Sequence, residues 1–108
     1  MWNDFESGAS LGTRGSEGGR IIHDQEKTGW ARITLEESCR KIPFAITCGL
    51  YGWMVHTRYV SDLPKANAEF EAMRHELEQI VTQIQNTPSS DLAKTVAQLC
   101  EEFVSRYP

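Results

Sequence analysis

The C-terminal part of the chain carries two runs of apolar residues with helical spacing, and this feature limits the fold more than any other. Residues 61–64, Ser-Asp-Leu-Pro, have the signals of a helix start, because a capping side chain is followed by proline in the first turn. In residues 70–84 and 92–107, apolar side chains then recur every three or four positions. The short break at residues 86–90 predicts an antiparallel helical hairpin, whose apolar stripes need a further surface to cover them.

The preceding segment is predicted to supply that surface as a β-sheet. Between residues 30 and 37, apolar and polar side chains alternate, which is typical of a strand with one buried face. A turn signal, Lys27-Thr28-Gly29, joins this segment to residues 20–26. The two segments together predict a β-hairpin.

Residues 44–60 are rich in β-branched and aromatic side chains and leave two interpretations open. Gly49 and Gly52 flank Leu50-Tyr51, which favours a second hairpin turning there, whereas the alternative is one long strand bent at the glycines. In the hairpin interpretation Phe44, Ile46, Cys48, Trp53, Val55 and Tyr59 share one face, and Ala45, Thr47, Met54, His56 and Arg58 share the other.

These elements predict an α+β fold: a small antiparallel sheet, followed by a C-terminal two-helix hairpin packed on one of its faces. The sheet has either two hairpins or three strands, one of them long and bent. We expect residues 20–108 to form a single domain. Residues 1–19 hold five of the eight glycines and predict a flexible, Gly/Ser-rich arm. Residues 12–20 could also form a backbone nest for an anion, but a flexible arm is the preferred interpretation.

Composition and charge restrict the partners and the compartment. The 108 residues have a formal net charge of -4 and no basic patch, so neither nucleic acid nor a membrane surface is an expected partner. There are three cysteines, an odd number without paired spacing, which indicates free thiols and a cytoplasmic location.

The strongest hint of catalysis is Cys48 with His56, which could form a thiol–imidazole pair. The hairpin register described above places the two side chains on opposite faces, so we expect Cys48 to be a small buried residue instead. Glu71 and His75 lie one helical turn apart but are too few for a metal site. We therefore predict no catalytic residues, no metal and no cofactor.

A second use is expected for the sheet, because apolar residues lie on both of its faces and a helical hairpin covers only one. Trp and Tyr are enriched in the cores of protein interfaces. The candidate binding residues, for an interface or a ligand, are Trp30, Tyr51, Trp53, His56, Arg58 and Tyr59.

These observations favour a small, non-catalytic binding or interaction protein that forms a homo-oligomer, expected to be a homodimer, or has a protein partner. Its acidity would suit an immunity- or antitoxin-type inhibitor of a basic target. The alternative is a small-ligand-binding protein or enzyme with its site beside the sheet, around Cys48 and His56.

Overall fold

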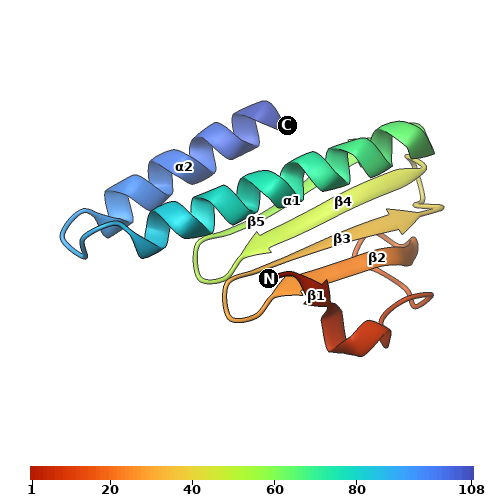
Figure 1. The fold of residues 1–108 in the computed structure, drawn as a ribbon. Coiled ribbons are helices and arrows are strands. Elements are labelled where there is room, and N and C mark those ends of the chain that lie inside the picture. The colour runs from red at the N-terminus through yellow and green to blue at the C-terminus, as the bar shows by residue number, and fades with distance from the viewer.

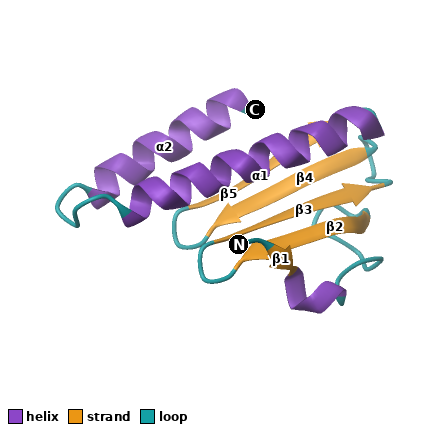
Figure 2. Cartoon of the chain, viewed as in Figure 1, coloured by secondary structure: helices purple, strands orange, loops and turns teal.

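A computed structural model describes all residues from 1 to 108 and shows an α+β fold (Figures 1 and 2). The elements in chain order are β1 (Asn3–Asp4), the 3-10 helix η1 (Phe5–Gly8), β2 (Arg20–Lys27), β3 (Ala31–Glu37), β4 (Phe44–Leu50), β5 (Met54–Val60), α1 (Leu63–Gln85) and α2 (Leu92–Arg106). The five strands form one antiparallel sheet in the order β1-β2-β3-β4-β5. The predicted fold class, a sheet followed by two packed helices, is confirmed.

Both helices lie on one face of the sheet, which we call the helix face (Figure 1). The core between the two layers contains Ile33 and Leu35 from β3, Ile46 from β4, Leu77 from α1 and Phe103 from α2, all fully buried. These are the positions that the two periodicities mark as apolar, so burial of matching stripes joins the helices to the sheet.

The first helix begins as its sequence predicts. The side chain of Asp62 accepts a hydrogen bond from the backbone N–H of Lys65 at 2.9 Å, and Pro64 lies in the first turn. This cap satisfies one of the N–H groups that lack a partner at a helix start.

Two loops of the same design close the hairpins β2-β3 and β4-β5. Each has three residues with glycine in the middle, Thr28-Gly29-Trp30 and Tyr51-Gly52-Trp53. The glycines have φ values of 81° and 83°, in the left-handed region that glycine enters most easily. The backbone N–H of Tyr51 donates to the carbonyl of Trp30 at 2.8 Å, so the two loops are joined at one end of the sheet.

The predicted second hairpin is present as β4 and β5, but its predicted register is wrong by one residue. A two-residue turn at Leu50-Tyr51 was expected, whereas Gly52 takes the positive φ and the loop contains three residues. Because side chains alternate along a strand, this slip moves every side chain of β5 to the other face. Met54, His56 and Arg58 lie on the helix face with Cys48, while Val55 and Tyr59 lie on the opposite face with Ala45 and Thr47.

The predicted N-terminal arm has a defined path against the sheet (Figure 1). Asn3 and Asp4 pair with the outer edge of β2. Further along the arm, the N–H of Gly12 donates to the carbonyl of Ile21 at 2.8 Å, and the N–H of Ile21 donates to Thr13 at 2.9 Å. The arm thus covers much of the β2 edge, and the flexibility expected from its glycines stays a prediction.

Candidate binding surface

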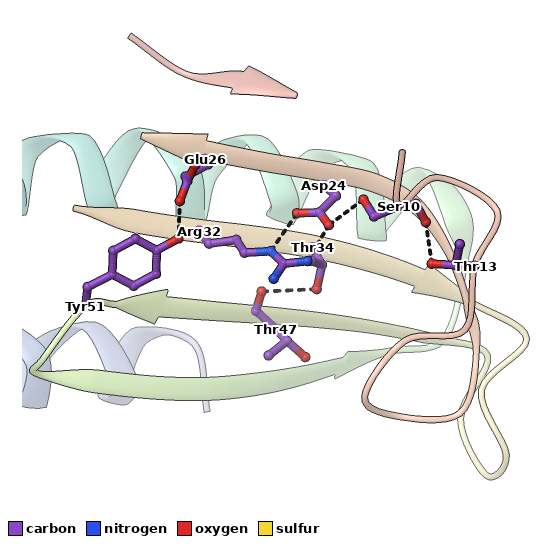
Figure 3. Close-up of polar contacts among 8 residues, drawn as sticks. All are labelled: Ser10, Thr13, Asp24, Glu26, Arg32, Thr34, Thr47 and Tyr51. Atoms are coloured by element: carbon purple, nitrogen blue, oxygen red, sulfur yellow. Dashed lines mark hydrogen bonds and ion pairs between the residues drawn. The ribbon is translucent and has the colours of Figure 1, made fainter. Parts of the chain in front are cut away.

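The face opposite the helices, which we call the open face, contains a partly buried ion pair beneath the arm. Arg32 on β3 donates from Nε and Nη2 to the two carboxylate oxygens of Asp24 on β2, at 2.9 and 2.6 Å. Ser10 of the arm donates to the same carboxylate at 2.7 Å (Figure 3). The centroid of the Phe5 ring lies 3.6 Å from Cζ of Arg32. Asp24 is only 1% exposed, so its charge depends on this bidentate partner and on the arm.

A second buried carboxylate, that of Glu36, is held by the glycine-rich loop. The backbone N–H groups of Glu17 and Gly19 both donate to its Oε1 at 3.1 Å. Gly15 passes so close that a Cβ atom there would lie 2.2 Å from the Glu36 carboxyl carbon. The loop therefore does form a backbone nest for an anion, and the anion is a side chain of the same protein.

The sequence patterns of β2 and β3 did not reveal the buried acids. Asp24 lies in a run of polar residues on β2, and Glu36 alternates with apolar residues on β3; both patterns normally indicate contact with solvent. One sequence signal could have revealed the buried Glu36: the unusual number of glycines before the sheet. Backbone that passes close to a buried side chain requires residues without side chains of their own.

Beside the arm, the open face has a cleft of about 760 Å³. Its floor includes Thr34 of β3 and Thr47 of β4, whose side chains are shown in Figure 3. One wall is the arm at residues 14–16 and the other is the β4-β5 loop at residues 51–53. This size and the mixture of apolar and polar lining match those of small-molecule sites.

Two of the predicted binding residues, Tyr51 and Trp53, line this cleft. The Tyr51 hydroxyl donates to Glu26 at 2.6 Å, and burial together with this hydrogen bond raises the pKa of Tyr51 to about 12. Tyr59 lies on the open face, where its hydroxyl donates to Glu17 of the arm.

The other predicted binding residues lie elsewhere. Trp30 is partly buried and packs against the core. His56 is on the helix face, where Nε2 contacts the backbone carbonyl of Tyr107. Arg58 lies beside it and forms a bidentate ion pair with Glu69 of α1. The six candidates are thus divided between two faces of the sheet and do not form one site.

Cys48 and His56 are direct partners across β4 and β5, contrary to the predicted register. Burial raises the pKa of the Cys48 thiol to about 12. A thiol with that pKa carries almost no thiolate at neutral pH and is a poor nucleophile. The geometry brings the pair together without activating it, and all three cysteines are free thiols.

The free edge of β5 is the remaining feature of this surface. β5 pairs only with β4, so its seven-residue outer edge presents unpaired backbone groups. Large apolar side chains are exposed on β5, with Val55 at 82% and Tyr59 at 48%, and on the loop before it, with Trp53 at 45%.

Other features of the chain point to no particular chemistry. No group of three metal-ligating side chains comes together. Neither helix has both the length and the apolar character needed to cross a membrane. Comparisons with protein-family models, with curated proteins and with solved structures found no significant match to the chain.

Proposed function

We propose that the protein is a non-catalytic interaction protein that pairs with a second copy of itself through the edge of β5. The observation that carries this proposal is the contrast between the two edges of the sheet. The outer edge of β2 is covered by β1 and by the arm, whereas β5 has no neighbour beyond β4.

The side chains of β5 suit pairing with another strand. Natural edge strands are commonly protected by lysine, proline or inward-pointing charges. On the open face β5 instead presents Val55, Thr57 and Tyr59, which favour strand structure. The one inward-pointing charge of β5 is Arg58, and its ion pair with Glu69 of α1 neutralises it. His56 is held on the same face by its contact with the carbonyl of Tyr107.

A two-fold axis at the middle of β5 would place this strand antiparallel to its own copy. Such pairing needs only one self-complementary surface and would extend the sheet through both subunits. Packing between the exposed side chains of Trp53, Val55 and Tyr59 would add apolar contact to the backbone hydrogen bonds.

No acidic side chain lies on β5, so the negative charge of the chain is carried elsewhere and this edge does not suit a basic target. Six acidic side chains form ion pairs with cations of the same chain, and Glu36 is buried. These pairs use as many cations as acids, so the net charge of the chain stays at -4. The three free thiols suit a reducing compartment such as the cytoplasm.

Light scattering coupled to size exclusion tests the proposal with Val55→Lys, which adds a charge at the β5 edge. Val55 is 82% exposed, so the substitution is expected to leave the fold intact. The matched control is Val104→Lys, at an exposed valine on α2. We expect twice the chain mass of 12.2 kDa for the wild type and for Val104→Lys, and a monomer for Val55→Lys.

A wild-type monomer at micromolar concentration would contradict the proposal. A dimer that persists in Val55→Lys would show that another surface is used. Circular dichroism of both variants confirms that they are folded before the masses are compared.

A further inference from the structure

The cleft on the open face shares Trp53 and Val55 with the proposed dimer surface, but it does not include the backbone edge of β5. Three separate parts of the chain form it. The arm covers the β2-β3 half of the open face, and its residues 14–16 form the border of the cleft. The β4-β5 loop rises at the other side, and Gly49 on the floor has no side chain to fill the space between them. The result is the cleft of about 760 Å³.

The charges that line the cleft have one sign. Arg14 and Arg32 are its only charged lining residues. Arg14 forms no ion pair within the chain, in contrast to Arg32, which is bound to Asp24. Two of the five N–H donors of Arg32 point at Asp24, so others stay available to a ligand. Unpaired guanidinium donors are suited to bind a carboxylate.

The remaining lining is suited to a planar apolar group. The side chains of Tyr51 and Trp53 are partly exposed on one wall, next to Val55. Aromatic side chains of this kind stack on flat rings and provide a large contact area. On the floor, the Thr34 hydroxyl donates to the carbonyl of Thr47 at 3.4 Å, and the Thr47 hydroxyl is 3.1 Å from that of Thr57. A hydroxyl oxygen that already donates can still accept a hydrogen bond from a ligand.

We infer that this cleft binds a small organic carboxylate with an aromatic body. The carboxylate would contact Arg14 and the free donors of Arg32, and the ring would lie against Tyr51 and Trp53. Both a free aromatic acid and the C-terminal carboxylate of a peptide that ends in an aromatic residue have this chemistry. All of the lining residues belong to one chain, so the inference can be tested on a monomeric protein as well.

The test uses N-acetyltryptophan and its neutral amide as probes, with binding followed by two-dimensional NMR of the labelled full-length protein. The acid is expected to shift the amide signals of Thr47, Gly49 and Trp53. The amide has the same ring but no negative charge, so it should bind about tenfold more weakly. A tripeptide that ends in tryptophan, with a free C-terminal carboxylate, distinguishes the two sources: tighter binding than the acid indicates a peptide, and weaker binding indicates a free acid.

Arg14→Gln supplies the matched variant, and Arg40→Gln is its control. Both arginines are exposed and neither forms an ion pair, so both variants should fold. Arg14→Gln should weaken binding of the acid about tenfold, while Arg40→Gln should leave it unchanged. Equal binding of acid and amide, no binding at millimolar acid, or no effect of Arg14→Gln would each overturn the inference.

Discussion

The two faces of the sheet are covered in different ways. The helix face is apolar, and α1 and α2 cover it with the side chains that their periodicity predicts. The open face has the buried acids Asp24 and Glu36, which are covered by an arm with few apolar residues. One face is held mainly by the burial of apolar area, and the other by specific hydrogen bonds and ion pairs.

The comparison shows that the polar side chains of a strand do not always face solvent. Apolar burial is non-directional and tolerates small changes in geometry, whereas a buried carboxylate must have its donors correctly placed. Glu36 obtains its donors from backbone N–H groups, and only a loop rich in glycine can approach it closely enough. The arm therefore completes the open face.

The largest effect is expected on the helix face, for Leu77→Ala. Leu77 is fully buried between α1 and the sheet, so we expect the free energy of unfolding to fall by about 2–5 kcal/mol. Gln83→Ala, at an exposed position of the same helix, should change it by under about 0.5 kcal/mol. Urea denaturation measures both values, and equal effects would mean that the assigned core face of α1 is wrong.

A smaller loss of stability is expected on the open face for Gly15→Ala. The added Cβ atom would meet the buried carboxyl group of Glu36, and the loop or the side chain must move to admit it. Overpacking of this kind costs about 1–3 kcal/mol. Ser16→Ala is the control, because Ser16 is exposed and next in the chain. If the two variants have the same melting temperature, the arm is not fixed on Glu36 in solution.

The sequence predicts the elements of the helix face well, and the register of the last strand poorly. Helical spacing in α1 and α2 and alternation in β3 correctly place core residues such as Leu77 and Ile33, since each pattern is local. The register of β5 was wrong because it depends on loop length, and two glycines, Gly49 and Gly52, competed for the turn.

The candidate site was predictable only in part. Tyr51 and Trp53 were identified because exposed aromatic residues in a small sheet suggest binding. Arg14 and Arg32 were missed as cleft residues, since the cleft exists only where the arm, the sheet floor and the β4-β5 loop meet. No local pattern records a contact between segments that lie far apart in sequence.

The smallest effect concerns pH and the β4-β5 loop. The pKa of Tyr51 is raised from 10.0 to about 12, because burial and the Glu26 hydrogen bond favour the neutral phenol. The stability from this group is therefore present below pH 10 and is lost as the pH rises toward 12. Thermal melts across this range should show a smaller loss in Tyr51→Phe than in the wild type. An identical loss in both proteins would mean that the Tyr51–Glu26 hydrogen bond is not formed in solution.

The most direct test of β5 pairing is amide hydrogen exchange over residues 54–60, measured by mass spectrometry in the wild type and in Val55→Lys. A paired edge protects the outward N–H groups of β5, and an open edge leaves them in contact with water. We predict slow exchange of this segment in the concentrated wild type, faster exchange on dilution or in Val55→Lys, and no change in β3. Exchange of residues 54–60 that is the same in both proteins at every concentration would contradict the account.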